Sequence, residues 1–265
     1  TVENEKGSAC YGMGIFQTNL SSKIKVTEIK SLNFSDFFKT KACNKHFNGH
    51  ATGGRIKSYK SKLLYTVGDL DHNVDGDRKI PQNINNAVGK VIAINKNGDF
   101  EVISSGHRNP QGLTVLGDKI FITEHGPKGG DEINRIIEDG NYGWPIASYG
   151  TYYNYDEKKY LKNHEKYGFL EPIFNYNPAI GISEIVKIPP DFIKDQDLEN
   201  IFFIGSLNGK SLFLTKFSSD FNKVILTEKI FINQRIRDLK YIDKHNLFLL
   251  ALEKPSQLAI LKNIN

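Results

Sequence analysis

Cysteine is scarce in this sequence, which has only Cys10 and Cys43 among its 265 residues. They form no Cys-x-x-Cys motif and have no histidines at zinc-finger spacing, which excludes the usual structural zinc sites. An even number of cysteines permits one disulfide, and two unrelated buried thiols are the alternative. The sequence leaves both open, because it does not give the Cα separation on which a disulfide depends.

Long apolar runs are also missing. No stretch approaches the roughly 18 apolar residues needed to cross a bilayer, so we expect no transmembrane segment. The chain opens with Thr1–Asn4 and has no signal-peptide core there, which predicts a mature protein or a fragment. The net charge of +5 is spread along the chain instead of forming a basic block, and it gives little support to nucleic-acid binding.

Glycine and aromatic residues are plentiful, with 23 glycines, 17 phenylalanines and 12 tyrosines, a composition typical of strands and turns. A recurrent apolar motif that opens with a turn-like polar residue predicts hairpins in series. Its first strands are 62–67, 119–124, 200–205 and 246–251, and the second strands that follow them are 90–94, 132–136, 211–215 and 257–261. The 46-residue interval between Ile201 and Leu247 fits one four-stranded blade of about 40 to 50 residues.

The longest interval between hairpins contains a region rich in Tyr, Asn, Gly and Lys. We expect residues 141–169 to form an inserted rim loop and residues 183–188 to add another strand. The sequence contains few helix signals. Single helical turns are predicted only at residues 34–39 and 190–194. A chain of this length can bury a substantial core as one domain, 1–265, and the pattern predicts an all-β protein.

Polar groups are dense between Gly106 and Pro145. Four short blocks lie there: Gly106-His-Arg-Asn-Pro-Gln-Gly-Leu113, Glu124-His-Gly-Pro127, Asp131-Glu-Ile-Asn134 and Asn141-Tyr-Gly-Trp-Pro145. They combine a permanently charged guanidinium, amides, a Gly-Pro corner and adjacent carboxylates with short apolar strands on either side. Ordinary surface loops seldom hold such a mixture, so these blocks predict a binding or catalytic rim.

The order and spacing of these blocks, from about Tyr11 to the C-terminus, resemble the soluble pyrroloquinoline quinone (PQQ)-dependent aldose or glucose dehydrogenases, the glucose/sorbosone dehydrogenase family. The resemblance implies a β-propeller, with six blades in a complete member. Nothing here matches the first blade and part of the second, so we expect four fairly complete blades, a remnant and an open edge with unpaired backbone groups. The family is periplasmic, which implies a periplasmic or secreted protein and favours the disulfide.

His50, in Asn48-Gly-His-Ala-Thr-Gly-Gly-Arg-Ile56, matches the histidine that precedes the Gly-Gly-Arg segment of the family. The resemblance implies a general base that takes the hydroxyl proton while a hydride leaves C1 of the sugar for PQQ. A loop histidine without a partner is the alternative, and for an isolated histidine it would be the better one. The Gly-Gly-Arg context favours the base.

PQQ contacts are implied for several polar residues. Arg108 and Asn109 match contacts to the quinone oxygens and carboxylates, for which a planar, always charged guanidinium is suited. Arg235 and Arg237 offer the same chemistry, because alternate residues of a strand share one face and can both reach a central tunnel. A solvated strand with a basic outer face is the alternative for this pair. Tyr153 is implied to stack on the cofactor or hydrogen-bond to it.

Calcium is the metal that the resemblance implies. Gly126 and Pro127 match a corner whose carbonyl oxygens coordinate the calcium that holds PQQ. Glu132 and Tyr142 match a second calcium site, with a carboxylate from the first residue and a main-chain carbonyl from the other. The alternative is that Asp131 and Glu132 are ordinary turn carboxylates, which is what adjacent acids usually are.

Two positions depart from the family. Its Ala-Leu-Lys block, whose lysine helps to hold PQQ, appears here as Ser206-Leu207-Asn208, so an amide replaces the cation. Asn177 stands where an aromatic residue is often found. We still expect Ser206, Leu207 and Asn208 to border the cofactor.

These features together predict a PQQ-dependent dehydrogenase that oxidises the C1 hydroxyl of aldose sugars and passes electrons to a quinone or other acceptor. The first alternative is a binding module, a calcium-stabilised propeller for carbohydrate or protein in which the Asn208 and Asn177 changes have ended redox chemistry. A propeller hydrolase that uses His50 and calcium ranks lowest, because it lacks a convincing second acid or base. Retention of His50, Arg108, Asn109 and both strand arginines favours the dehydrogenase.

Overall fold

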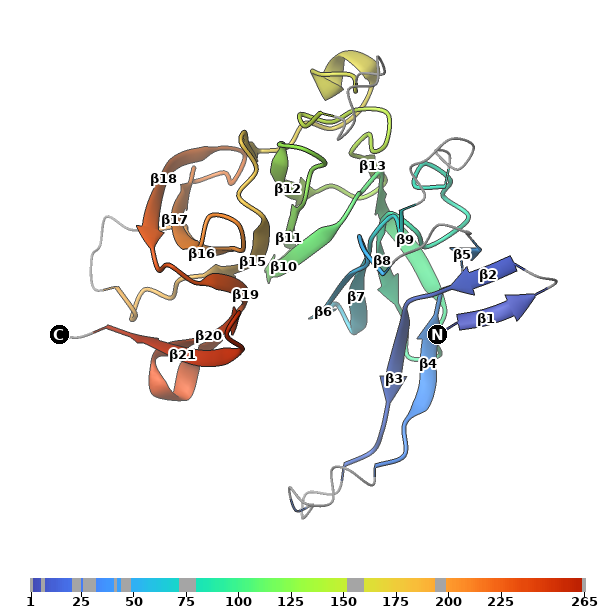
Figure 1. Ribbon diagram of the computed structural model, residues 1–265, viewed down its shortest axis with the longest axis horizontal. Helices are drawn as coiled ribbons and strands as arrows, with labels where there is room; N and C mark the ends of the chain where they lie inside the picture. Colours follow the sequence, from blue (N-terminus) through green and yellow to red (C-terminus); the bar gives the residue numbers. More distant parts are fainter. Residues whose placement is uncertain are drawn as a thin grey trace.

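The computed structural model is built from β-strands (Figure 1). It describes residues 2–5, 8–20, 25, 32–40, 42–43, 49–71, 80–151, 160–193 and 199–263. Helix within these ranges is limited to two short 3-10 turns, η2 (His164–Tyr167) and η3 (Asp243–His245). No helix in the described part of the chain is long and apolar enough to cross a membrane. The all-β prediction is confirmed.

Four sheets follow one another along the chain. The first contains β6 (Gly53–Tyr59), β7 (Lys62–Val67), β8 (Lys90–Ile94), β9 (Phe100–Ser105) and the short parallel strand β13 (Gly140–Asn141). The second contains β10 (Pro110–Leu116), β11 (Lys119–Glu124), β12 (Asp131–Ile136) and β14 (Phe174–Tyr176). The third contains β15 (Ile182–Lys187), β16 (Ile201–Ser206), β17 (Ser211–Phe217) and β18 (Val224–Phe231). The fourth contains β19 (Arg235–Ile242), β20 (Leu247–Glu253) and β21 (Gln257–Lys262).

The predicted hairpins are therefore confirmed, with ends that differ by one or two residues. The polar residues that open β16 and β20 explain where these strands begin. Asn200 has a φ of 58° and Asn246 a φ of 45°. Asparagine tolerates this left-handed region better than most residues, so it can reverse the chain directly before an apolar strand.

Two smaller sheets lie near the N-terminus. One contains β1 (Val2–Glu5), β2 (Ser8–Tyr11) and β5 (Ala42–Cys43), and the other is the hairpin of β3 (Gly14–Gln17) and β4 (Ser35–Lys39). The prediction of a helical turn at 34–39 is wrong, because this segment pairs with β3 and buries Phe38 against Tyr65. At 190–193 the chain makes a turn, closed by the Phe192 N–H bond to the Pro189 carbonyl, and no helix.

Adjacent sheets pack face to face through apolar side chains. Leu64 and Ile122 lie in the core between the first and second sheets, Phe121 and Phe202 in the core between the second and third, and Phe248 in the core between the third and fourth. The first strands of the four sheets contact one another in the order β6, β10, β15, β19. They surround a common axis (Figure 1), which is the arrangement of blades in a β-propeller.

The two cysteines lie on neighbouring strands. β2 pairs with β5 so that Cys10 is directly opposite Cys43. Opposed residues of an antiparallel pair have Cα atoms about 4.5–5.5 Å apart, within the range that a disulfide spans. The backbone register agrees with a bridge, and the disulfide itself stays a prediction.

Arg55 on β6 contacts the inner strand of each of the other three sheets. Its Nη1 lies 3.1 Å from Glu184 Oε2 on β15 and 2.8 Å from Asp238 Oδ2 on β19. Its Nε donates to the Gln111 carbonyl on β10, and its Nη2 donates to the Arg237 carbonyl at 3.3 Å. One guanidinium thus connects the four sheets at their common axis.

Glu184 is the buried partner of this guanidinium, with 2% of the residue exposed. Its Oε1 accepts the N–H groups of Leu113 and Ile185, each at 3.0 Å. Burial raises the pKa of Glu184, and Arg55 is the strongest opposing influence. The carboxylate therefore depends on Arg55 for its charged form.

Replacing Arg55 should destabilise the fold. We expect Arg55→Met to lower the free energy of unfolding by about 2–4 kcal/mol, because Glu184 stays buried without its counter-charge while Arg55 itself is partly exposed. Urea denaturation measures this loss. In a Glu184→Gln background the same substitution should lower the free energy of unfolding by clearly less. An equal loss in both backgrounds would contradict the role of the ion pair.

Candidate functional site

The loop that joins β9 to β10 begins at Gly106 and carries Arg108. Gly106 has a φ of 73°, and a Cβ at this position would collide with Asn141 Oδ1 and lie 2.6 Å from Gly143 N. Only glycine therefore lets the loop lie against the 141–143 segment. On its other side the loop is held by the Asp69 N–H, which donates to the Arg108 carbonyl at 2.7 Å.

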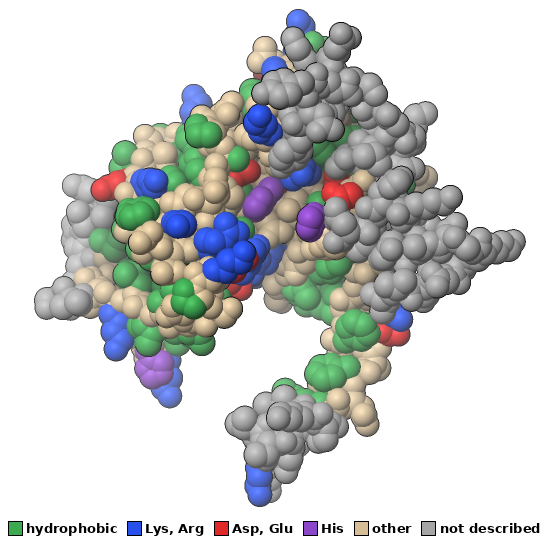
Figure 2. Space-filling view, viewed as in Figure 1, with side chains coloured by type: hydrophobic (Ala, Val, Ile, Leu, Met, Phe, Trp, Pro, Cys, Tyr) green, Lys and Arg blue, Asp and Glu red, His purple; other side chains and the backbone are tan. Residues whose placement is uncertain are grey.

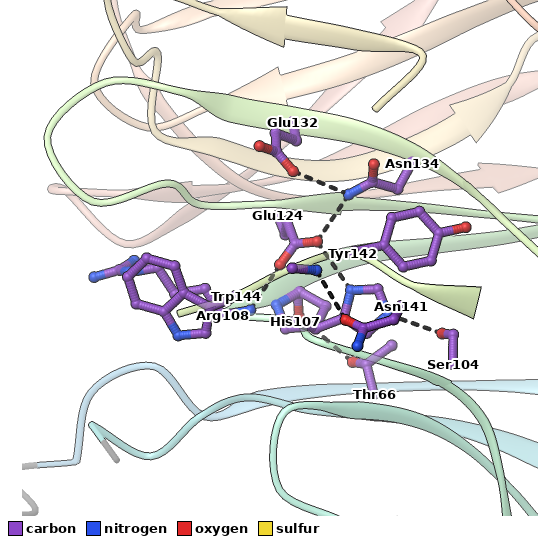
Figure 3. Close-up of polar contacts among 12 residues, drawn as sticks. Thr66, Ser104, His107, Arg108, Glu124, Glu132, Asn134, Asn141, Tyr142 and Trp144 are labelled. Atoms are coloured by element: carbon purple, nitrogen blue, oxygen red, sulfur yellow. Dashed lines mark hydrogen bonds and ion pairs between the residues drawn. The ribbon is translucent and has the colours of Figure 1, made fainter. Parts of the chain in front are cut away.

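A chain of buried hydrogen bonds supports Arg108 (Figure 3). Ser104 Oγ lies 2.8 Å from His107 Nε2, and His107 Nδ1 lies 3.0 Å from Glu124 Oε1. Glu124 Oε2 accepts the Arg108 N–H at 2.8 Å. An ionised carboxylate only accepts hydrogen bonds, so this network assigns the ring proton to Nδ1 and leaves Nε2 to accept the Ser104 hydroxyl.

Asn134 extends the network to a second buried carboxylate. Its Nδ2 donates to Glu124 Oε1 at 2.8 Å and to Glu132 Oε2 at 3.3 Å. Burial and the nearby charge of Glu124 raise the pKa of Glu132 well above its ordinary range. Burial acts on Glu124 in the same direction, but His107 and the N–H donors outweigh it and hold the pKa of Glu124 below its ordinary range. A positive charge next to Glu132 would favour its ionised form.

A cavity of about 10 Å³ lies beside Glu132, enough for one water-sized atom or ion. Its lining consists of Gly106, Arg108, Glu124, His125, Gly126, Glu132, Tyr142, Trp144, Ala147 and Ser148. Among the described residues, Arg108 Nε and His125 Nε2 are buried and have no hydrogen-bond partner. Buried polar atoms without a partner are rare in folded proteins, so these two indicate a place for a polar ligand.

Trp144 and His125 fix the Arg108 guanidinium. The guanidinium carbon lies 5.4 Å from the centre of the indole ring, and Nη1 donates to the His125 carbonyl at 3.2 Å. The indole is held in turn, because Trp144 Nε1 donates to Asp69 Oδ2 at 2.7 Å. The position of the guanidinium is therefore set before any ligand binds. Trp144 is also the only tryptophan of the chain, so its fluorescence reports on this site alone.

The predicted calcium corner at Gly126 and Pro127 is rich in main-chain oxygen. A Cβ on Gly126 would collide with the carbonyl oxygens of Gly129 and Gly130. The Gly126 N–H donates to Asp131 Oδ1 at 3.1 Å. Close-packed carbonyl oxygens are the ligands that a hard cation such as calcium prefers.

Asp131 has a structural role that the sequence did not indicate. Besides Gly126, it accepts the N–H groups of Ile180 and Ile182 through Oδ2, each at 3.0 Å. It is 1% exposed. Asp131 therefore joins β12 to the start of β15, and Glu132 alone of the adjacent pair faces the small cavity.

The second predicted calcium site depends on Glu132 and Tyr142. The Tyr142 hydroxyl donates to the Arg135 carbonyl and accepts the Ile137 N–H at 3.1 Å. Only main-chain oxygen of Tyr142 is then left for a cation. No cluster of three or more His, Cys, Asp or Glu side chains that could hold a metal occurs in the ranges that the structure describes. A cation at Glu132 therefore needs carbonyl oxygens in addition to this carboxylate.

Arg235 and Arg237 contact the same carboxylate. Arg235 Nε donates to Glu253 Oε2 at 3.2 Å, and Arg237 Nη2 donates to the same oxygen at 2.9 Å. Arg237 Nη1 also lies 3.5 Å from Gln111 Oε1, and Gln111 Nε2 donates to Asn109 Oδ1 at 2.8 Å. These contacts connect the two strand arginines to the Arg108 loop.

The residues that follow His50 are joined to neighbouring loops through their backbone. The side-chain oxygen of Asn109 accepts the Gly53 N–H at 3.2 Å, which joins the Gly-Gly-Arg segment to the Arg108 loop. The Ala51 carbonyl accepts the Leu70 N–H at 3.1 Å, directly after Asp69. His50 itself is exposed and is not part of the small cavity lining.

The Ser206-Leu207-Asn208 block lies beside the same arginines. Ser206 Oγ donates to the Ile180 carbonyl at 2.6 Å, and the Leu207 carbonyl lies 3.5 Å from Arg235 Nη1. Ser206 and Leu207 are buried, whereas Asn208 is exposed. Tyr153, the remaining predicted cofactor contact, lies outside the described residues.

Two residues at the site were missed in the sequence. Gln82 pairs with Asn141 through both amides, at 2.7 and 3.2 Å, and also donates to the Trp144 carbonyl at 2.6 Å. Lys90 is completely buried, and its Nζ donates to the carbonyls of Pro81 and Val88, both at 2.7 Å. Lys90 thereby holds the segment that carries Gln82, and no motif marks either residue.

The family model for glucose/sorbosone dehydrogenases matches residues 12–260. The chain belongs to this family. An uncharacterized protein of Synechocystis sp. is 28% identical over 85% of this chain, and the aldose sugar dehydrogenase YliI of Escherichia coli is 27% identical over 97% of it. The chain spans 58% and 69% of the length of these two relatives.

Solved structures of a glucose dehydrogenase and an aldose sugar dehydrogenase share the fold. A glucose dehydrogenase structure superposes with a TM-score of 0.80 at 24% identity, covering 100% of this chain and 77% of that one. The PQQ-bound form of an aldose sugar dehydrogenase from Streptomyces coelicolor gives a TM-score of 0.56 at 21% identity, covering 75% of this chain and 55% of that one.

Lys90 should give this family member a distinct pH dependence. Burial lowers the pKa of Lys90 to about 7. Unfolding restores an ordinary pKa of about 10.4, so the unfolded chain binds an extra proton between these values and stability rises with pH across that window. Urea denaturation between pH 7 and 9 should show stability rising by up to about 1.4 kcal/mol per pH unit relative to Lys90→Met. Lys240→Met, at an exposed lysine, is the control, and parallel profiles for the wild type and Lys90→Met would contradict the assignment.

Proposed function

We propose that this protein is a PQQ-dependent sugar dehydrogenase that oxidises the C1 hydroxyl of an aldose. The observation that carries the proposal is the group of three arginines at the axis, in which Arg108 Nε is buried without a partner and Arg235 and Arg237 converge on one side. Guanidiniums suit the carboxylates and quinone oxygens of PQQ. The PQQ-bound relative with the same fold supports this choice of cofactor.

The protein's part in this reaction is to bind, orient and exchange a proton. When bound, PQQ supplies a quinone carbon that accepts a hydride. Arg108, fixed over Trp144, brings a permanent positive charge to the place where negative charge increases during reduction. Asn109 shares its side-chain oxygen with Gly53 and Gln111, which leaves its amide hydrogens for the cofactor.

We assign the proton transfer to His50. Its exposed position makes it accessible to a sugar, and a neutral imidazole is the usual general base at neutral pH. The backbone bonds of Ala51 and Gly53 connect its segment to the segments that carry Asp69 and Arg108. The His50 ring takes the proton of the C1 hydroxyl while a hydride leaves C1.

Substitution of His50 tests the activity. The purified protein is titrated with PQQ and calcium, and a panel of aldoses and an artificial electron acceptor are then added while reduction of the acceptor is followed. His50→Ala should lower turnover by about 10²- to 10⁴-fold, the usual contribution of a general base, without changing PQQ affinity. His245→Ala, at an exposed histidine in η3, is the matched control. Full turnover by His50→Ala would remove His50 from the mechanism.

We propose calcium at both sites that the sequence predicted. The carbonyl oxygens of Gly126 and Pro127 would hold the ion that contacts PQQ, and Glu132 with the main-chain oxygen of Tyr142 would hold the second. The buried Glu132 carboxylate supports the second site, because its hydrogen bond to Asn134 is long at 3.3 Å and it lines an ion-sized cavity. A charge–charge interaction with Lys162 already acts on this carboxylate, and calcium would add a second positive charge beside it.

Removal of the Glu132 charge tests the second site. Calcium should raise the melting temperature of the wild type, and a chelator should reverse the effect. Glu132→Gln keeps the shape of the side chain but should weaken calcium binding by about tenfold or more. Calorimetric titration with calcium measures the affinity, and Glu228→Gln, an exposed carboxylate on β18, is the control. Equal calcium affinities of Glu132→Gln and the wild type would contradict a site at Glu132.

A calcium-stabilised binding module is the second candidate function. It is favoured by Asn208, whose exposed amide stands where the family has a lysine. In that function the protein would bind carbohydrate or another protein without PQQ. Failure of PQQ to bind in the titration above would support it. With either function we propose a periplasmic or secreted location, and the dehydrogenase also needs an electron acceptor such as a quinone.

A further inference from the structure

We propose that Glu253 is a positioning residue that holds Arg235 and Arg237 together as a pair of guanidiniums for a carboxylate ligand. The inference rests on the proposed function, since PQQ is the carboxylate ligand of that function. No sequence motif marked Glu253, because it lies on β20 and the two arginines lie on β19.

The register of the fourth sheet brings these three side chains together. Glu253 is the direct cross-strand partner of Arg235. A bulge between Ile236 and Asp238 leaves Arg237 without a partner of its own on β20, so its side chain can also reach Glu253. Both guanidiniums donate to one oxygen, Glu253 Oε2, at 3.2 and 2.9 Å.

The two guanidiniums need this counter-charge to stay together. The two donor nitrogens reach the same oxygen, so they are at most about 6 Å apart, a distance at which like charges repel in a partly exposed site. Within the described residues their other contacts are long, with Leu207 O and Gln111 Oε1 both at 3.5 Å. Glu253 therefore supplies the short contacts that fix both side chains.

Glu253 does not use up the donors that a ligand needs. Each guanidinium carries five N–H groups, and the carboxylate engages one nitrogen of each. Burial raises the pKa of Glu253, but the two arginines outweigh it and hold that pKa below its ordinary range. The carboxylate is therefore ionised at neutral pH and serves as a permanent support.

The surrounding charges leave this pair available for an anion. Arg55 on β6, which donates to the Arg237 carbonyl, is already matched by Glu184 and Asp238. The contacts of the Arg108 guanidinium within the described residues are a carbonyl and an indole ring. Figure 2 shows Lys and Arg side chains gathered near the middle of this face, beside histidines. Three guanidiniums and one carboxylate suit a ligand that carries more than one carboxylate.

Isothermal titration of the full chain tests the proposal. The ligands are PQQ, with calcium present, and citrate as a simple polycarboxylate probe. Glu253→Gln should weaken the binding of both by about five- to tenfold, because the guanidiniums separate and must be brought together by the ligand. Glu253→Asp, which keeps the charge, should recover part of the affinity. Glu101→Gln makes the same change in net charge at a carboxylate that pairs with Lys62 on the first sheet, and it should have no effect.

The direction in which Glu253→Gln changes anion affinity decides between a positioning role and a purely electrostatic one. A purely electrostatic role predicts that loss of a negative charge tightens anion binding, so tighter or unchanged binding by Glu253→Gln would overturn the proposal. Thermal unfolding of each variant separates a loss of fold from a loss of affinity. If the wild type binds citrate but not PQQ, the proposed function fails. The citrate affinities of the wild type and the Glu253 variants then decide the role of Glu253. If the wild type binds neither, both proposals fail.

Discussion

The contact of Arg55 with Glu184 and Asp238 is the interaction on which the rest of the structure depends. Each sheet packs only against its neighbours, so apolar packing alone sets pairwise angles and does not fix the inner strands around the axis. The Arg55 guanidinium does so, because it bonds to all three other inner strands at once. The positions of Gln111 and Arg237, and with them the two sides of the candidate site, follow from it.

A second constraint lies beneath the site. Glu124 is buried and accepts hydrogen bonds from His107, the Arg108 main chain and Asn134. Such a network is costly to bury unless every member is satisfied, and it then allows few alternative arrangements. The Arg108 loop is therefore set by a buried network. Within the described residues Asn134 Oδ1 has no partner, and a cation beside Glu132 would add a positive charge between the two buried carboxylates.

Much of the candidate site could be predicted from local sequence. Arg108, Glu132 and the Gly126–Pro127 corner belong to short motifs in which spacing along the chain reflects spacing in the fold. Glu253 and Gln82 belong to no motif. Their roles depend on which strand lies beside β19 and on how the 80–89 segment is folded back by Lys90, and neither can be derived from residues nearby in sequence.

Local sequence was enough to predict the all-β class and the series of hairpins, because short apolar runs and the turn residues that open them act over a few positions. It failed at 34–39, where the short Phe-rich segment fits a helical turn equally well and pairing with β3 decides the outcome. Tertiary structure alone decided which carboxylate meets which guanidinium, as in Arg55 with Glu184 and Arg235 with Glu253. Charge pairing depends on the register and packing of strands, and a sequence records only the order of its residues.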